Sequence, residues 1–298
     1  MYKNIEAFGG DPQKITLFGE SAGAGSVDAL VTLPPDPLPF RAAIMESGQA
    51  TFANSYYLPN QNNKSQIAWN NLAANLSLSP QDAIPIIKKM DAVVLKDKIE
   101  HLALEWYATK GDDVTWSSTP RQNRNQSPTD GGKKFAAVPL LIGSNGDEGS
   151  FYQYFGTPQN KLDYTDLAFQ CPAQLVAQET SPKNNGQTWR YYFNASFPNN
   201  RPFPNSGAFH SSEIPEVFGT YNRNGATQRQ SDISKAMMKA WADFAKNPSQ
   251  GPGWNAVPKV QVYDGSENKD AQYEVDEAIV DGGRCKALRS SYDAWFPA

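Results

Sequence analysis

The residues Ile15–Gly25, with the sequence ITLFGESAGAG, decide how the rest of the chain is interpreted. β-Branched and bulky apolar residues fill the first four positions, which favours a buried parallel strand. Small and apolar residues follow from 22 to 33, which favours a helix packed on a sheet. The two segments meet at Gly19-Glu20-Ser21-Ala22-Gly23, a Gly-x-Ser-x-Gly pattern. This stretch therefore predicts a strand, a sharp turn that holds a serine, and a helix.

The serine of such a turn adopts a strained backbone conformation that lifts its hydroxyl above the edge of the sheet. We expect Gly19 and Gly23 to leave room for the helix to pack closely on the strand. Because the first amides of the helix point toward the same place, we expect the N–H group of Ala22 to stabilise an oxyanion formed when Ser21 attacks. A glycine-rich turn with a capping serine would give the same short pattern without any chemistry.

Length and composition describe an acidic globular chain. Its 298 residues carry a net charge of −4 and 39% of them are hydrophobic, which suits one large α/β domain or two smaller ones. No basic cluster of the kind that binds nucleic acid is evident. The apolar runs are too short to cross a membrane, and residues 1–10 lack the pattern of a secretory signal peptide. We therefore expect neither a nucleic-acid partner nor a membrane span.

Two cysteines and three glycosylation sequons bear on whether the protein is secreted. The spacing of Cys171 and Cys285 excludes a zinc finger but allows one long-range disulfide. Asn63, Asn75 and Asn194 each begin an Asn-x-Ser glycosylation sequon. These sequons predict glycosylation at the three asparagines and point toward secretion.

The remaining sequence mixes strand and helix patterns. Residues 1–8 look like the end of a helix, and the polar segment 111–134 is interpreted as a long surface loop. Further strands are expected at 41–48, 136–143, 189–193 and 259–263. Further helices are expected at 66–76, 80–90, 93–109, 165–179, 214–218, 231–246 and 284–296.

Candidate acids for a reactive serine follow one of the predicted strands. A serine hydroxyl is a weak nucleophile at neutral pH and needs a general base, which in turn needs a carboxylate to orient it. Asp147 and Glu148 come shortly after the strand at 136–143. The carboxyl ends of parallel strands form the edge where ligands bind in open α/β sheets. The residues themselves do not decide between these two acids.

The general base must be one of two histidines. His101 lies in a predicted helix, with Asp97 and Glu105 one helical turn to either side, as on a solvated helix face. His210 lies in a loop of small residues and is the better candidate. The resulting chain order of serine, acid and histidine matches that of α/β hydrolases.

Several segments together resemble the type B carboxylesterases, the family of the cholinesterases and the fungal carboxylesterase-type lipases. The segment Asn4-Ile5-x-x-Phe8-Gly9-Gly10-Asp11-Pro12 and the turn at 18–23 resemble the nucleophile region of that family. Residues 43–48 resemble its next strand, 140–149 its acid segment, 209–219 its histidine segment, and 241–246 with Trp254 its C-terminal helix and loop. The resemblance covers nearly the whole chain. It implies one α/β-hydrolase domain over residues 1–298, with a mostly parallel central sheet and flanking helices.

The resemblance implies a reaction and gives roles to the candidate residues. The reaction is hydrolysis of a small-molecule or lipid carboxylic ester through an acyl-enzyme, with Ser21 as the nucleophile and His210 as general base and acid. The acid segment of the family implies that Glu148, rather than Asp147, orients His210. No metal or organic cofactor is needed.

Supporting features are also implied by the resemblance. Glu20 and Glu213 are expected to lie behind the three reacting side chains. Cys171 and Cys285 fall where some relatives form a disulfide, and many relatives are secreted.

The chain departs from the family at its start. Relatives carry a further N-terminal region with the first strands and a glycine-rich oxyanion segment, so we expect the C-terminal portion of the fold, with the strand at 15–18 unpaired on one side. Poor solubility and ester hydrolysis at least about a hundredfold slower than in an intact relative would follow. The alternatives are a catalytically impaired fragment and a non-catalytic cholinesterase-like protein; the presence of Ser21 and His210 argues against the second.

Overall fold

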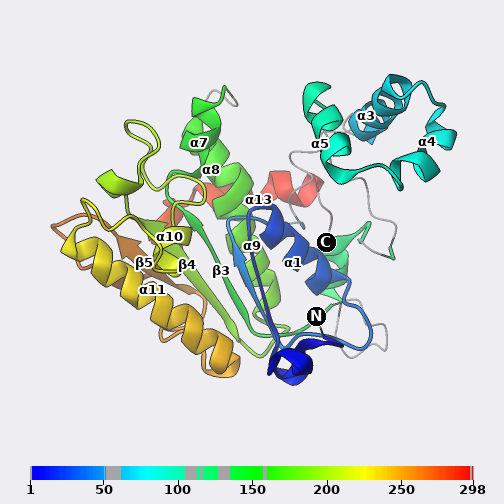
Figure 1. The fold of residues 1–298 in the computed structure, drawn as a ribbon. Helices are drawn as coiled ribbons and strands as arrows, with labels where there is room; N and C mark the ends of the chain where they lie inside the picture. The colour runs from blue at the N-terminus through cyan, green and yellow to red at the C-terminus, as the bar shows by residue number, and fades with distance from the viewer. Residues whose placement is uncertain are drawn as a thin grey trace. The chain divides into compact units, whose positions relative to one another are not determined.

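A computed structural model describes residues 2–49, 51, 62–104, 113–114, 117–126, 135–156, 160–295 and 297. Within these residues, six strands form one sheet in the order β1-β2-β3-β4-β5-β6. Neighbouring strands run parallel from β1 to β5, and β6 is antiparallel to β5 (Figure 1). The strands are β1 (Thr16–Glu20), β2 (Ala42–Glu46), β3 (Leu140–Asn145), β4 (Thr188–Asn194), β5 (Lys259–Asp264) and β6 (Gln272–Asp276).

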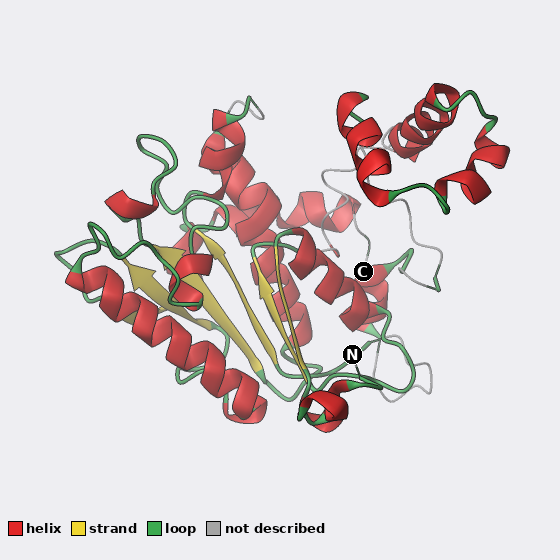
Figure 2. Cartoon of the chain, in the orientation of Figure 1, coloured by secondary structure: helices red, strands yellow, loops and turns green. Residues whose placement is uncertain are grey.

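Helices flank this sheet, which confirms the predicted α/β class (Figure 2). None of the helices in the described ranges is both long and apolar enough to span a bilayer. They are α1 (Ala22–Thr32), α3 (Asn62–Asn75), α4 (Pro80–Ile87), α5 (Ala92–His101), α6 (Pro120–Asn125), α7 (Glu148–Tyr154), α8 (Lys161–Thr165), α9 (Cys171–Thr180), α10 (Ile214–Val217), α11 (Gln228–Lys246), α12 (Glu277–Asp281) and α13 (Arg284–Trp295).

The two faces of the sheet belong to separate hydrophobic cores. In β2, Ala43 and Met45 join a core that includes side chains of α1 and α9, whereas Ala42 and Ile44 join a core that includes side chains of α11. Because side chains alternate across a strand, a strand of continuous apolar residues serves both cores. Figure 1 shows α11 on one side of the sheet and α1 and α9 on the other.

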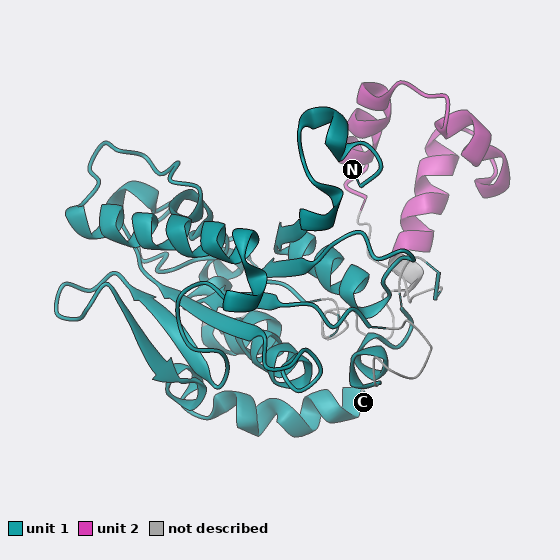
Figure 3. Cartoon of the chain, turned by 90° about the horizontal axis from the view of Figure 1, so that it is seen from below, with its two compact units in different colours: residues 1–55, 113–298 teal, residues 56–112 magenta. Residues whose placement is uncertain are grey.

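The chain divides into two compact units, coloured separately in Figure 3. Residues 1–55 and 113–298 form the unit that contains the sheet, and residues 56–112 form a helical unit. In the helical unit, Leu72, Ala73 and Ala83 are buried, and the indole N–H of Trp69 donates to the carbonyl of Pro80 at 3.2 Å. The prediction of a single domain over the whole chain stays a prediction.

The expected loop at 111–134 is wrong in part, because it contains α6. Arg124 of this helix is fully buried and forms an ion pair with Asp28 of α1, and Thr51 accepts a second hydrogen bond from it at 2.8 Å. Arg121 pairs with Glu179 of α9 at 2.7 Å. The polar sequence of this segment suggested solvent exposure, whereas these charges are paired with residues far away in the chain.

Other expected boundaries also changed. The expected helix end at 1–8 is a 3-10 helix, Ile5–Phe8, and the helix expected at 165–179 is divided into α8, a π-helical turn at Asp166–Gln170 and α9. The helix expected at 93–109 is α5, with a turn after it, and residues 105–109 lie outside the described ranges. The strand β6 and the helices α7 and α12 were not expected.

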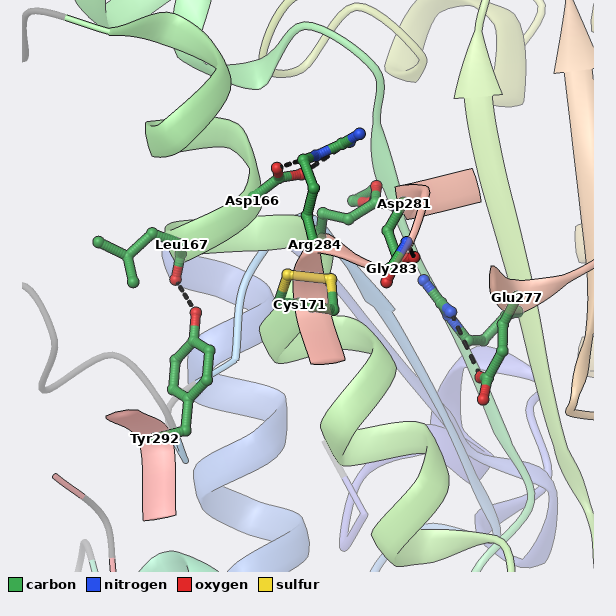
Figure 4. The surroundings of a disulfide bond; sticks show 12 residues. Asp166, Leu167, Cys171, Glu277, Asp281, Gly283, Arg284 and Tyr292 are labelled. Atoms are coloured by element: carbon green, nitrogen blue, oxygen red, sulfur yellow. Dashed lines mark hydrogen bonds and ion pairs between the residues drawn. A yellow bond between two sulfur atoms is a disulfide. The ribbon is translucent and has the colours of Figure 1, made fainter. Parts of the chain in front are cut away.

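Cys171, at the start of α9, and Cys285, in α13, form a disulfide with a Cα–Cα distance of 5.0 Å. Figure 4 shows the neighbouring contacts that hold α13 on the same helical segment. The guanidinium of Arg284 pairs with Asp166, and the hydroxyl of Tyr292 donates to the carbonyl of Leu167. The disulfide that the resemblance implied is therefore present.

Candidate active site

Ser21 lies at the turn between β1 and α1 and has a backbone φ of 55° and ψ of −120°. This positive φ is rare for a residue with a side chain and marks strain at the turn. The backbone N–H of Ser21 donates to the carbonyl of Glu46 at 2.8 Å, which fastens the turn to the end of β2. The hydroxyl of Ser21 thereby stands at the carboxyl edge of the parallel sheet.

Two glycines permit this turn, and they differ from the expected pair. A Cβ atom on Gly19 would lie 2.3 Å from the backbone of Gly23, and one on Gly48 would lie 2.1 Å from the carbonyl oxygen of Ser21. In contrast, a Cβ atom on Gly23 would meet nothing within 4 Å. The close approach of strand and helix that was expected here is present and requires glycine at position 19. Position 23 does not require glycine for its own side chain, and the requirement at Gly48 was missed.

His210 joins Ser21 to Glu148. Its Nε2 atom lies 2.8 Å from Ser21 Oγ, and its Nδ1 atom lies 2.6 Å from Glu148 Oε2. Glu148 is fully buried at the start of α7, and its other oxygen accepts the backbone N–H of Asn145 at 2.7 Å. The three side chains therefore form an unbroken series of hydrogen-bonding contacts.

Asp147 has a different place from its neighbour Glu148. Its Oδ2 atom accepts the backbone N–H of Ala208 at 3.3 Å, and its own N–H donates to the carbonyl of Ala208 at 2.9 Å. Gly207 has a φ of 64°, and a Cβ atom there would lie 2.2 Å from Asp147 Oδ2. Asp147 thus ties the loop of His210 to the end of β3 through the backbone.

Glu20 and Glu213 both lie beside this series of contacts. Glu20 Oε1 lies 3.5 Å from His210 Nε2 and accepts the hydroxyl of Ser211 at 2.6 Å. Glu213 is fully buried, accepts the hydroxyl of Ser47 at 3.4 Å and forms a further hydrogen bond with the amide of Asn145. Ala22, the first residue of α1, is exposed next to Ser21.

Comparison with known proteins identifies the family. The family model described as "Carboxylesterase family" matches residues 1–164 and 161–278. The chain belongs to the carboxylesterase family. Secreted lipase 5 of Gibberella zeae is 30% identical over 84% of this chain, and chlorogenic acid esterase of Aspergillus niger is 33% identical over 86%. These alignments cover 51% and 50% of those two proteins, so this chain spans about half the length of its curated relatives.

A solved structure supports the same fold. A PNB esterase superposes with a TM-score of 0.68 at 22% identity, and the superposition covers 95% of this chain and 66% of the PNB esterase chain. At this level of identity the comparison shows the α/β-hydrolase fold and carries no statement about substrate.

The candidate site is rich in buried carboxyl groups. Burial would lower the pKa of His210, but the carboxylates of Glu148, Glu20 and Glu213 raise it above its usual value. Burial and the charge of Glu148 raise the pKa of Glu213 to about 8. Burial and the nearby Glu213 raise the pKa of Glu46 well above its usual range. At neutral pH, Glu213 is therefore mainly protonated, and the raised pKa of Glu46 favours the neutral form of that carboxyl group. Both shifts limit the negative charge around the histidine.

Aromatic rings pack around His210. Its ring centroid lies 4.7 Å from that of Phe169, 5.3 Å from that of Tyr152 and 6.4 Å from that of Phe151. Phe151 and Tyr152 belong to α7, the helix that begins with Glu148. The sequence interpretation missed these aromatic residues. Phe151 and Tyr152 follow Glu148 by three and four residues, a spacing that places side chains on the same face of one helix.

Other predicted residues lie elsewhere. His101 is exposed on α5, and its Nδ1 atom lies 2.7 Å from the carbonyl of Asp97 in the same helix. Asn75, at the end of α3, and Asn194, at the end of β4, are exposed, as glycosylation requires. The side chain of Asn63 lies outside the described residues.

Proposed function

We propose that this chain hydrolyses carboxylic esters through a Ser21–His210–Glu148 triad. The observation that carries the proposal is the series of contacts of 2.8 Å and 2.6 Å that joins the three side chains at the edge of the sheet. A hydroxyl, an imidazole and a carboxylate in this order form the arrangement that activates a serine in acyl transfer. The strained φ of Ser21, at 55°, further supports a serine held ready for attack.

The proposed reaction has two halves. In the first, Ser21 Oγ attacks the ester carbonyl carbon while its proton moves to His210 Nε2; the C–O bond then breaks, and the same proton passes to the leaving alcohol. Glu148 accepts the Nδ1–H group, which fixes the tautomer and stabilises the imidazolium. In the second half, water repeats the sequence on the acyl-enzyme and releases the carboxylic acid.

The oxyanion requires donors on the open side of Ser21. The N–H group of Ala22 begins α1, where the first amides of a helix have no partner within the helix and the helix dipole favours negative charge. We assign it as one oxyanion donor. Glu20 and Glu213 are assigned as residues that support the triad. Glu20 adds negative potential near Nε2 of His210. Glu213 binds the side-chain amide of Asn145, whose backbone N–H donates to Glu148.

The substrate is proposed to be a small-molecule or lipid ester. The aromatic side chains of α7 and Phe169 give the site an apolar wall, which suits an apolar ester. The relatives named secreted lipase and chlorogenic acid esterase both carry ester-hydrolase names. The disulfide and the name of the secreted relative also support secretion of this protein, because disulfides persist in oxidising compartments.

Hydrolysis of p-nitrophenyl butyrate by the purified chain tests this proposal. Ser21→Ala removes the nucleophile, so turnover is expected to fall by at least roughly a thousandfold to the background that remains without the triad. Ser26→Ala is the matched control, because Ser26 lies on α1 and its hydroxyl donates to the carbonyl of Ala22 at 2.9 Å. Turnover that persists in Ser21→Ala would overturn the proposal.

A further inference from the structure

Asn145 is the last residue of β3, at the edge of the sheet where the proposed triad assembles. It is fully buried, and its position in the sheet is fixed by pairing with Phe193 of β4. Its backbone N–H donates to Glu148 Oε1 at 2.7 Å. The main chain of Asn145 therefore holds one oxygen of the carboxylate whose other oxygen contacts His210.

The side chain of the same residue binds the segment that carries the histidine. Its Nδ2 atom donates to the carbonyl oxygen of Phe209 at 2.9 Å and also to the carboxyl group of Glu213. A carbonyl oxygen can only accept a hydrogen bond, so the amino group of the amide, and not its oxygen, must face Phe209. This carbonyl belongs to the peptide unit that joins Phe209 to His210. The amide thus fixes the backbone from which the imidazole projects.

The amide contributes to this arrangement through its donors. Within the described part of the chain, the Oδ1 atom of Asn145 is buried and has no hydrogen-bond partner. A buried acceptor without a partner costs stability, so packing alone does not explain an amide at this position. The Nδ2 atom, in contrast, has two acceptors, and both lie in the segment 209–213 that contains His210.

We propose that Asn145 is a positioning residue, which joins the triad acid to the histidine segment and so sets the contact between Glu148 and His210. This inference rests on the proposed ester hydrolysis. Without the amide, Glu148 would keep the backbone N–H that holds it, and the contacts of Asp147 with Ala208 would keep the histidine segment attached to the sheet. The link adjacent to the histidine would be lost, so the imidazole would shift relative to the carboxylate.

Loss of the amide should affect turnover more than substrate binding. Asn145→Ala should lower kcat for p-nitrophenyl butyrate by roughly ten- to a hundredfold, because a shift of about 1 Å at a reacting group costs up to about a hundredfold. KM should change by less than about twofold, since the side chain is buried and binds only the protein. Asn145→Leu keeps the branched shape and removes the donors, so it should show a similar loss of kcat.

Asn184→Ala is the matched control. Asn184 is also buried, and its Nδ2 atom donates to the carbonyl oxygens of Val138 and Gln187 at 3.0 and 2.9 Å. These residues precede β3 and β4, at the end of the strands opposite to Asn145. Asn184→Ala should lower the stability to urea, as Asn145→Ala does, while kcat stays within about twofold of the wild-type value.

A double substitution separates positioning from general damage to the fold. If Asn145 acts through the contact between acid and histidine, its amide has little left to position once Glu148→Gln has removed the acid. Adding Asn145→Ala to Glu148→Gln should therefore lower kcat by less than about a further twofold. Independent damage would instead multiply the two losses.

The outcomes distinguish this inference from the proposed function. With Ser21-dependent hydrolysis by the wild type, an unchanged kcat in Asn145→Leu, or losses that multiply in the double substitution, would overturn the role of Asn145 while the proposed function stood. A wild-type chain without Ser21-dependent hydrolysis would overturn the proposed function, and this inference with it.

Discussion

Adjacent carboxylates have different partners in this chain. Glu148 Oε2 lies 2.6 Å from the imidazole of His210, whereas Asp147 Oδ2 accepts a backbone N–H at 3.3 Å. The substitution Glu148→Gln keeps the size of the side chain but allows the wrong histidine tautomer, so kcat should fall by roughly 10³ to 10⁴. Steady-state hydrolysis of p-nitrophenyl butyrate measures this loss.

Asp147→Asn is the matched control for that substitution. It removes the same charge one residue earlier, where the carboxylate binds the backbone of the histidine loop, and should have a much smaller effect on kcat. If Asp147→Asn were the more damaging of the two, the assignment of Glu148 as the triad acid would be wrong.

The pH dependence of activity reports on the protonation of His210. The reaction needs neutral His210, and kcat/KM follows the protonation of the free enzyme, so activity should fall as the pH drops through the pKa of His210. That pKa is raised by Glu148 and Glu20 against the opposing effect of burial. Glu20→Gln removes a negative charge 3.5 Å from Nε2, so the acidic midpoint of the kcat/KM profile should move to lower pH. An unmoved or higher midpoint would contradict this electrostatic account.

At the residue scale, the sequence pattern pointed to Ser21, His210 and two candidate acids, and the resemblance selected Glu148. Neither the sequence pattern nor the resemblance indicated Glu46 as a residue of the site. The carboxyl group of Glu46 accepts the indole N–H of Trp241 at 2.6 Å. These two residues lie far apart in the chain, and no local spacing signals a contact that only the packing of α11 on β2 creates.

The element that defines the site is the turn between β1 and α1. Gly48→Ala would place a Cβ atom 2.1 Å from the carbonyl oxygen of Ser21, and this clash with the backbone cannot be relieved by the movement of a side chain. We expect the rate of fluorophosphonate labelling at Ser21 to fall by at least roughly a hundredfold, because misplacement by about 1 Å at a reacting atom costs that much.

Gly23→Ala provides the comparison for this turn. A Cβ atom at Gly23 meets nothing within 4 Å, and alanine is a better helix former than glycine. Labelling of Gly23→Ala should stay close to the wild-type rate. The reverse order, with Gly23 sensitive and Gly48 tolerant, would show that the described turn is incorrect.

Elements with strong local patterns were predictable, and elements that depend on distant partners were not. The apolar strand β1, the turn and α1 were expected from one short stretch. In β6, exposed and half-buried residues alternate at the sheet edge, so its hydrophobic signal is weak. Helix α6 is stabilised by buried Arg124 and its partner Asp28, and pairing of this kind cannot be read from a polar segment alone.

At the scale of the whole molecule, the disulfide links α9 to α13 across a sequence separation of 114 residues. In the chain-entropy model, closing a loop of that length stabilises the fold by roughly 4 to 5 kcal/mol. The double substitution Cys171→Ser with Cys285→Ser should lower the free energy of unfolding by about that amount, measured by urea denaturation.

The control for this prediction is reduction of the wild-type protein. Unfolding of the reduced wild-type protein should match that of the double substitution, since both lack the covalent link. Equal stability of the oxidised wild type and the double substitution would contradict a stabilising role for the disulfide.

The central claim is that Ser21 carries the acyl group during ester hydrolysis. Acid quenching of the chain during turnover of p-nitrophenyl butyrate, followed by mass spectrometry of its peptides, tests this claim most directly. We predict a butyryl group on the peptide that contains Ser21, and none on that peptide in Ser21→Ala or His210→Ala. A butyryl group on another residue, or turnover without any acylated Ser21 peptide, would contradict the account.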